Sequence, residues 1–382
     1  MMKTSATVAL ISPSPLTQRS LLVHRYGAVG ARPKAYLQAG LHADELPGLL
    51  VLHHLQTLLD KAEENNDIIG EIVIVPVANP IGLGQHLNGH LVGRFDFETG
   101  KNFNRDFPNL TTAVLEKITP QLTNSAPQNV QLIRDCLQTL LQTKTLETEP
   151  EGLKRALLRL SIDADYVLDL HCDGEAIVHL YVSKHHEAQG VQLGAQLGAK
   201  TILLEDNAGG DPFDEANAGI WWKLREQLPT SIPLPLACFA TTIELRGQAD
   251  VDETLARSDA LNLFRYLQRC GLIAGHIEPL PTALCEPTPL EGTDVLKAPI
   301  AGVLAYHKTL GEYVHAGEVV ADVVNITASS PEQARIPVIS QTDGIIFARR
   351  LEKLVRPGES FCKIAGKHKL AHREYGKLLG NK

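Results

Sequence analysis

The stretch GLHADELPG, residues 40–48, places a histidine and a glutamate three positions apart, His42 and Glu45, just before a leucine-rich segment. At this spacing an imidazole nitrogen and a carboxylate oxygen can meet one divalent ion at about 2.0 to 2.2 Å. The pair alone is weak evidence, because HxxE arises by chance and the helix dipole favours an acidic residue in a first helical turn. A metal site therefore needs a third ligand from elsewhere in the chain.

The segment YVLDLHCDG contains the best candidate for that ligand, His171. It follows the buried-looking run 167–170, so we expect it at the end of a strand, a position equivalent to that of His42. Two histidines and one glutamate that leave a fourth position open are typical of a catalytic zinc site, whereas structural sites use four protein ligands. The expected chemistry is metal-assisted activation of water.

The elements around these residues follow an α/β pattern. Strands are expected at 34–38, 71–77, 166–170, 177–182, 201–204 and 241–245, with helical patterns between them, which is typical of a largely parallel sheet flanked by helices. Residues 46–64 repeat apolar side chains near the helical period. Residues 128–160 also read as helical with a break at 145–152, and 205–220 reads as a glycine-rich acidic loop. The carboxyl ends of parallel strands meet at one edge, which would bring His42 and His171 together.

A proline-rich segment separates this region from a second pattern. Residues 276–294 are expected to be a linker, because their prolines exclude a helix. Beyond it the chain repeats itself, with Gly302 matching Gly344, Val314 matching Val355, and Gly317 matching Gly358. This repeat predicts a small β domain whose two halves intertwine, and it resembles the biotinyl/lipoyl carrier fold, a barrel-like β-sandwich. The segment between the halves, NITASSPEQARIP, lacks a lysine to modify, so we expect a module that packs against or partly covers the catalytic domain.

Composition excludes several classes of function. The 382 residues are 44% hydrophobic and 21% charged, as in globular proteins with a substantial core, and they are enough for two domains. A net charge of -8 spread along the chain gives no field that recruits nucleic acid or anionic membranes. The start of the chain lacks a secretory pattern and no apolar run reaches the length of a membrane span, so we expect a cytoplasmic protein with a small-molecule substrate. Homo-oligomerisation is left open.

Six motifs occur in the order in which they occur in one known family: GLHADE, NPIG at 79–82, GRF at 93–95, NRDFP at 104–108, DLHCDG, and TIELRG at 242–247. Over residues 30–250 the chain resembles the succinylglutamate desuccinylase/aspartoacylase branch of the zinc carboxypeptidase superfamily. The resemblance implies one zinc ion per chain, held by His42, Glu45 and His171. It also implies a catalytic domain at 1–275, followed after the linker by a β domain at 295–366 and a basic tail at 367–382.

The resemblance further implies roles for four polar residues. Glu244 would accept a proton from the attacking water and later donate it to the leaving amine; the alternative is a salt bridge with Arg246. Arg94 would polarise the scissile carbonyl and stabilise the oxyanion. Arg105, supported by Asn104, would bind the substrate carboxylate through its planar guanidinium. The alternative for both arginines is solvation at the surface.

The predicted reaction is hydrolysis of the amide bond of a small N-acylated amino acid or a related carboxylate-bearing amide. The acyl group and the amine stay open. The alternatives are a metallocarboxypeptidase that acts on peptides and a non-catalytic homologue that binds a metal or ligand. Asp169 and Asp173 are either partners of a ligand imidazole or caps of a turn.

Overall fold

The structure is a computed structural model that describes residues 3–143, 148–371 and 373. It forms two compact units, each made of three chain segments: Met1–His171, Gly210–Thr242 and Asp252–Pro279 in the first, and Cys172–Gly209, Ile243–Val251 and Leu280–Lys382 in the second. The boundaries of these units differ from those of the expected domains at 1–275 and 295–366. The chain passes from one unit to the other inside two of its strands, after residues 171 and 242. Most of the predicted basic tail at 367–382 lies outside the described residues.

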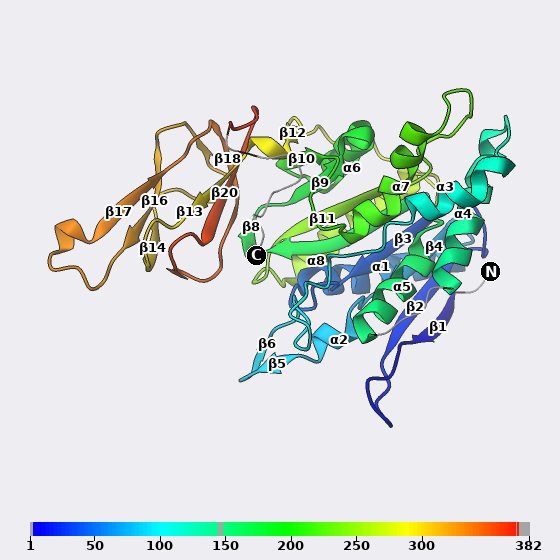
Figure 1. Cartoon of the computed structure of the whole chain (residues 1–382), viewed down its shortest axis with the longest axis horizontal. Coiled ribbons are helices and arrows are strands. Elements are labelled where there is room, and N and C mark those ends of the chain that lie inside the picture. Colours follow the sequence, from blue (N-terminus) through cyan, green and yellow to red (C-terminus); the bar gives the residue numbers. More distant parts are fainter. Residues whose placement is uncertain (1–2, 144–147, 372, 374–382) are drawn as a thin grey trace. The chain divides into compact units, whose positions relative to one another are not determined.

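A mixed sheet forms the centre of the first unit (Figure 1). Its order is β1-β2-β4-β3-β7-β11, with bounds β1 Thr4–Ala9, β2 Ser20–Tyr26, β4 Glu71–Val75, β3 Lys34–Ala39, β7 Tyr166–Asp173 and β11 Phe239–Gly247. Strand β3 runs parallel to both β4 and β7, while β1 and β2 form an antiparallel edge. The mixed, largely parallel sheet predicted from the sequence is confirmed. The edge pair was not predicted; the side chains of β1 are almost all exposed and show no alternation, whereas those of β2 begin with alternating burial.

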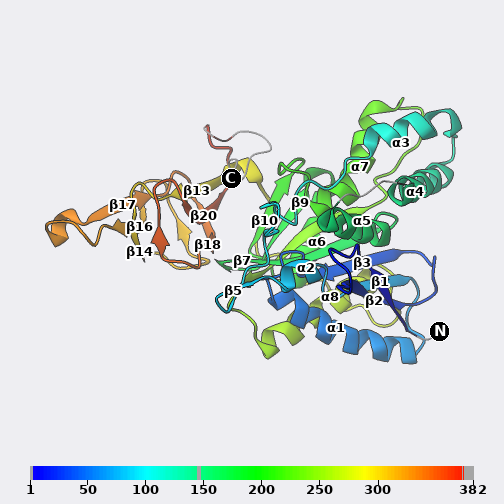
Figure 2. The same cartoon turned by 60° about the horizontal axis from the view of Figure 1, so that its bottom comes forward.

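Helices cover both faces of this sheet (Figure 2). On one face α1 (Pro47–Glu64) packs against α8 (Glu253–Arg269). The opposite face carries α3 (Thr111–Ile118), α4 (Ala126–Thr143), α5 (Glu149–Ser161) and α7 (Phe213–Gln227). A core of buried apolar side chains joins these four helices to the sheet, and it includes Tyr36, Val73, Val167, Leu157 and Trp221. The short helix α2 (Pro80–Leu83) and the hairpin β5 (His86–Leu87) and β6 (His90–Leu91) follow β4.

Several expected boundaries of these elements were wrong. Strand β7 continues to Asp173, so His171 lies inside the strand and not after its end. Strand β11 continues to Gly247, two residues beyond the expected end at residue 245. Helix α7 begins at Phe213, so only the first part of the predicted loop 205–220 is irregular. Helix α5 begins within the expected break at 145–152, because Thr148 and Glu151 form a capping box there; residues 144–147 lie outside the described residues.

In the second unit β11 is followed in the sheet order by β9 (His179–Ser183), β10 (Thr201–Glu205) and β12 (Thr288–Pro289). Strand β10 runs parallel to both of its neighbours, and α6 (Glu187–Leu197) connects β9 to β10. Strand β12 lies within the predicted linker, so part of that segment has regular structure. Gly190 and Gly194 of α6 let the helix approach the sheet, since a Cβ on either would lie under 3 Å from Val182 or Ile202.

The C-terminal module consists of two antiparallel sheets that share one apolar core. One sheet has the order β13-β20-β18-β15 and the other β17-β16-β14-β19, with bounds β13 Thr293–Lys297, β14 Gly302–Tyr306, β15 Tyr313–Val314, β16 Val319–Val324, β17 Arg335–Ile339, β18 Gly344–Arg349, β19 Leu354–Val355 and β20 Ser360–Gly366. The repeated residues pair crosswise: Gly302 faces Val355, and Gly344 faces Val314. The two halves therefore intertwine, as the repeat predicts.

A short strand joins this module to the segment that follows β7. Strand β8 (Glu175–Ala176) pairs with β18, and Glu175 forms ion pairs with Arg349 at 3.0 Å and Lys353 at 2.7 Å. Asp173 pairs with Lys363 in the same unit. Burial alone would raise the pKa of Asp173, but the Lys363 ammonium holds it below its ordinary value.

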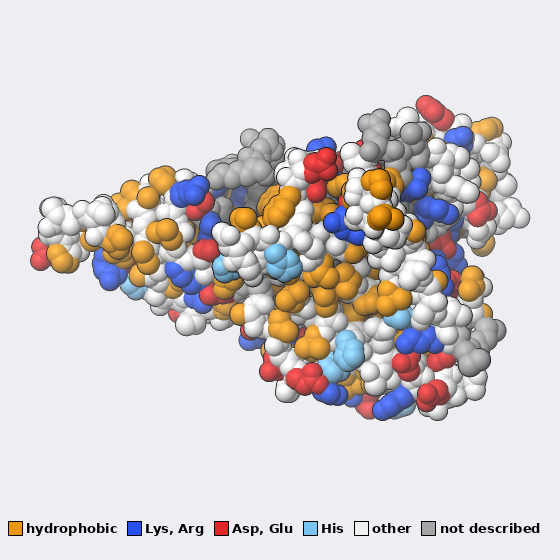
Figure 3. Space-filling model, turned by 90° about the horizontal axis from the view of Figure 1, so that it is seen from below, with side chains coloured by type: hydrophobic (Ala, Val, Ile, Leu, Met, Phe, Trp, Pro, Cys, Tyr) orange, Lys and Arg blue, Asp and Glu red, His pale blue; other side chains and the backbone are white. Residues whose placement is uncertain are grey.

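The surface carries charges of both signs. On the face that Figure 3 shows, acidic and basic side chains are interspersed. Among the described residues, no helix combines the length and the apolar character that a membrane crossing requires.

The ion pair between Asp173 and Lys363 gives a test of this packing. Replacing Lys363 by Met leaves a largely buried carboxylate without its cation, so we expect the free energy of unfolding to fall by about 1 to 3 kcal/mol. Lys367→Met is the control, because Lys367 and its partner Glu286 form an exposed pair. Urea denaturation midpoints measure the difference. Equal midpoints for the two variants would contradict the prediction.

Candidate metal centre

The loop between β3 and α1 carries the first two predicted ligands. Strand β3 ends at Ala39, and Gly40 turns the chain with φ +69°. This positive φ favours glycine, and a Cβ at this position would also lie 2.9 Å from the terminal methyl of Leu49. Helix α1 begins at Pro47 and has no acidic residue in its first turn. Glu45 therefore precedes the helix, and the helix dipole does not explain its position.

Two further motifs hold this loop in place. Asn79 of NPIG donates from Nδ2 to the carbonyl of Leu41 at 2.9 Å, and its Oδ1 accepts from Gly82 N at 2.8 Å. Gly93 of GRF accepts a backbone hydrogen bond from Ala43 at 3.1 Å, and a Cβ on Gly93 would lie only 2.7 Å from the Ala43 Cβ. These motifs therefore fix the backbone on either side of His42.

The structure brings the three predicted ligands together. One ligand atom of each of His42, Glu45 and His171 lies within 4.8 Å of the others, and all three side chains are buried. The Nδ1 of His42 lies 2.9 Å from Glu45 Oε1, and the Nδ1 of His171 lies 2.8 Å from Glu45 Oε2. Neighbouring ligands of tetrahedral zinc are about 3.4 Å apart. A small shift of these side chains would therefore admit an ion.

The outer nitrogen of each imidazole faces an oxygen that accepts. His42 Nε2 lies 2.8 Å from Asn102 Oδ1, and His171 Nε2 lies 2.9 Å from Asp169 Oδ2. The oxygen of Asn102 also accepts from the backbone N–H of Asn104, which fixes the orientation of its amide. Each Nε2 therefore carries a proton, and the Nδ1 atoms are left for a metal. This donor set of two imidazoles and a carboxylate, with partners on the outer nitrogens, fits zinc.

Charges around Glu45 shift the pKa values of all three groups. Burial lowers the pKa of His42 to about 4, and the nearby Arg94 guanidinium acts in the same direction. Burial alone would lower the pKa of His171, but the carboxylates of Asp169 and Glu45 raise it well above its ordinary value. Burial would raise the pKa of Glu45, yet the two histidines hold it well below its usual range. A cation therefore belongs beside Glu45, and a proton and a metal compete for the same nitrogens.

Arg94 reaches this centre from the GRF loop. Its Nη1 lies 2.8 Å from Glu45 Oε1 and 3.2 Å from His42 Nδ1, while 38% of its side chain remains exposed. The arginine thus contacts the ligand group while part of its side chain remains in solvent. Its role at an oxyanion stays a prediction.

Asn104 and Arg105 lie on the loop between β6 and α3, and this loop contacts the start of α7. The Oδ1 of Asn104 accepts from Phe213 N at 2.9 Å, so this buried amide holds the first turn of α7. Arg105 donates to the Asn104 carbonyl at 2.6 Å, and its stem leaves no room for a side chain on Gly210. Lys154 donates to the Arg105 carbonyl. Binding of a substrate carboxylate by these two residues stays a prediction.

Glu244 is half-buried in β11 and belongs to the second unit, whereas the three ligands belong to the first. Its role in proton transfer stays a prediction. Of the two aspartates considered from the sequence, Asp169 is the partner of the His171 imidazole, while Asp173 pairs with Lys363.

Two residues that contact this centre or its partners, Asn102 and Gln38, were not predicted from the sequence. Gln38 donates from Nε2 to Asp169 Oδ1 at 2.9 Å and is fully buried. A glutamine in the middle of a buried strand next to the ligand loop was a usable signal. Asn102 lies in an irregular loop, and no periodicity or spacing could have identified it.

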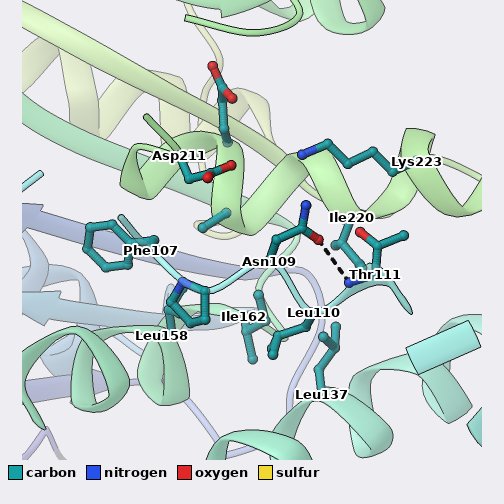
Figure 4. Close-up of a pocket in the computed structure, with 13 residues that line it drawn as sticks. Phe107, Asn109, Leu110, Thr111, Leu137, Leu158, Ile162, Asp211, Ile220 and Lys223 are labelled. Carbon is teal, nitrogen blue, oxygen red and sulfur yellow. Dashed lines mark hydrogen bonds between the residues drawn. The ribbon is translucent and has the colours of Figure 1, made fainter. Parts of the chain in front are cut away.

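Two hollows occur near the loop of residues 93–111. The hollow between residues 107–111 and α7 is about 20 Å³, room for roughly one water molecule (Figure 4). A larger pocket of about 180 Å³ is lined by Asn102, Lys101, Asp106 and side chains at the start of α5. That volume suits a small organic molecule. Asn102 thus borders this pocket and also contacts His42.

The catalytic-domain model of the succinylglutamate desuccinylase/aspartoacylase family matches residues 31–269. The chain belongs to this family. It is 26% identical over 350 residues to N-alpha-acetyl-L-2,4-diaminobutyric acid deacetylase of Halomonas elongata, covering 88% of this chain and 83% of that protein. The match confirms the family predicted from the six motifs, and it supports a hydrolase that acts on amide bonds.

Solved structures of desuccinylase/aspartoacylase proteins confirm the fold. One from Shewanella frigidimarina NCIMB 400 has a TM-score of 0.84 at 24% identity and covers 95% of this chain and 97% of its own. One from Shewanella amazonensis SB2B has a TM-score of 0.83 at 24% identity, with coverage of 95% and 99%. The likeness extends over both the catalytic region and the C-terminal module.

The close approach of Gly93 to the ligand loop gives a second test. Gly93→Ala would push Ala43 and the neighbouring His42 out of place, so we expect the purified variant to retain much less zinc than the parent. Gly84→Ala is the matched control, because a Cβ there would meet only ordinary contacts from 3.4 Å. The zinc content of both variants is measured by mass spectrometry, and circular dichroism checks that they are folded. A folded Gly93→Ala protein with a full complement of zinc would contradict the expectation.

Proposed function

We propose that this member of the family is a zinc-dependent deacylase that hydrolyses the amide bond of a small N-acylated amino acid or a related carboxylate-bearing amide. The observation that carries the proposal is the convergence of two Nδ1 atoms on the carboxylate of Glu45, with both outer nitrogens held by acceptors. Family membership and the deacetylase relative support the reaction class. A cytoplasmic location is part of the same prediction.

The ligands in this proposal are His42, Glu45 and His171, and one zinc ion is expected per chain. When bound, zinc supplies Lewis-acid chemistry that makes water a nucleophile near neutral pH. Asn102 and Asp169 hold the Nε2 protons, so that both imidazoles bind through Nδ1. Because these contacts are buried, the ligand geometry is set before the substrate arrives.

The remaining residues act on the proton and on the developing charge. Glu244 takes a proton from the attacking water on its carboxylate and delivers it to the nitrogen of the leaving amine. Arg94 donates N–H groups toward the oxygen that becomes negative during attack, because its guanidinium already lies beside the ligands and is partly exposed. Arg105 pairs with the carboxylate of the substrate, and Asn104 holds the loop on which Arg105 lies.

Removal of the proton acceptor separates metal binding from turnover. Glu244→Gln keeps the size of the side chain but cannot accept the proton, so we expect it to retain zinc and to lose about 10²- to 10⁴-fold in kcat. His171→Ala is the contrasting variant and should lose the metal itself. Zinc content and kcat are measured for both. Activity of Glu244→Gln close to that of the parent would remove this residue from its role.

A substrate panel tests the reaction class. The zinc-loaded protein is assayed for amine release from N-acetylated and N-succinylated amino acids, including Nα-acetyl-2,4-diaminobutyrate, and from blocked dipeptides. Turnover confined to the small acyl amino acids is expected. Preference for the peptides would instead support a carboxypeptidase. Absence of bound zinc and of turnover would favour a non-catalytic binding protein.

A further inference from the structure

Two polar side chains are buried in the sheet under α7. Tyr36 and Gln38 belong to β3, where every residue is buried, and neither side chain is exposed at all. Phe213 of α7 packs on the ring of Tyr36, with the centroids 5.9 Å apart. Polar groups in such a place destabilise the fold unless they are hydrogen-bonded. Their partners therefore show what they do.

These partners form one series of hydrogen bonds that ends at the candidate metal ligand His171. Gln38 and Asp169 are directly opposite each other in the parallel pairing of β3 with β7. Tyr36 donates its hydroxyl to Gln38 Oε1 at 2.8 Å, and Gln38 donates from Nε2 to Asp169 Oδ1 at 2.9 Å. The other oxygen of Asp169 faces His171 Nε2 at 2.9 Å. Asp169 and His171 are two residues apart in β7, so they lie on the same face of the sheet.

The donors and acceptors of these groups allow only one direction for this series of hydrogen bonds. Asp169 Oδ1 accepts from the NH₂ end of the Gln38 amide, which leaves Oε1 of that amide for a donor. The hydroxyl of Tyr36 is that donor; burial and the nearby Asp169 raise its pKa well above its ordinary value, so it keeps its proton. Rotation of the amide would break both hydrogen bonds together. Asp214, from α7, does not compete, because its carboxylate accepts from Glu215 N and the Thr242 hydroxyl.

We propose that Tyr36 and Gln38 are positioning residues for the third metal ligand. They hold the carboxylate of Asp169 in the orientation that keeps a proton on His171 Nε2 and directs Nδ1 toward Glu45. This inference rests on the proposed zinc site, and it is independent of which amide the protein hydrolyses.

A comparable hydrogen bond in the same unit provides a matched control. Ser161 donates to Asn217 Oδ1 at 2.7 Å, and both side chains are buried. The amide of Asn217 in turn donates to the carbonyl of Phe213 within α7. Loss of the Ser161 hydroxyl therefore removes a buried hydrogen bond without touching the residues between Tyr36 and His171.

The test is the affinity for Zn²⁺, measured on the full-length protein by competition with a chromophoric chelator. Gln38→Met conserves the volume but cannot donate, and the Kd for Zn²⁺ is expected to rise about 10- to 100-fold. Tyr36→Phe should raise the Kd in the same direction by less. Ser161→Ala should leave it within about twofold of the parent, although it lowers thermal stability.

A double variant tests whether Tyr36 acts through Gln38. Tyr36→Phe in the Gln38→Met background should cause no further rise in Kd, since the amide that it holds is gone. The visible spectrum of the Co²⁺-substituted protein gives a second readout: it should change in Gln38→Met and remain that of the parent in Ser161→Ala. Additive effects of the two substitutions would overturn the proposed series of hydrogen bonds.

Other outcomes separate this inference from the proposed function. An unchanged Kd in folded Gln38→Met overturns the inference, whatever the activity. If Gln38→Met fails to fold, Tyr36→Phe decides, because it removes only a hydroxyl, and an unchanged Kd and Co²⁺ spectrum would then overturn the inference. A parent protein that binds zinc in the expected way but hydrolyses no amide would remove the proposed function and leave the inference intact.

Discussion

The buried carboxylate of Glu45 is the constraint on which the rest of the site depends. An anion this deep in a protein is very unfavourable unless positive charge and hydrogen bonds surround it. Two imidazoles and one guanidinium converge on it, from a loop, a strand and a second loop. The loops and the strand around Glu45 hold the two imidazoles and the guanidinium close to its carboxylate. The result is a buried cluster of two imidazoles and a carboxylate that could hold a divalent ion.

Several residues of the family motifs hold the backbone in place. The asparagine of NPIG ties down the carbonyl next to His42, and the glycine of GRF allows two loops to touch. Asn104 of NRDFP fastens the start of α7. The motifs thus combine groups that would act on a substrate with groups that keep the ligand loop rigid. A motif match alone does not separate the two kinds.

The sequence predicted the sheet from its short β-rich runs and α1 from its apolar repeat, and it predicted the metal group from residue types at strand ends. The predictions failed where contacts between residues remote in the sequence determine the structure. His171 lies inside β7 because the strand continues past the sheet edge to Asp173. Asn102 and the pairing of Gln38 with Asp169 depend on residues that are remote along the chain, and local patterns contain no information about them. The partner of Asp173 proved to be a lysine in the C-terminal module for the same reason.

The crosswise pairing in the C-terminal module has a kinetic consequence. Its first strand, β13, pairs with its last, β20, and the short strands of each half pair with the opposite half. No sheet of the module can close until almost all of it has been synthesised, and such non-local topologies fold slowly. Strand β8 can pair with β18 only after β18 has been synthesised. The segment just after His171 therefore forms these contacts late in synthesis.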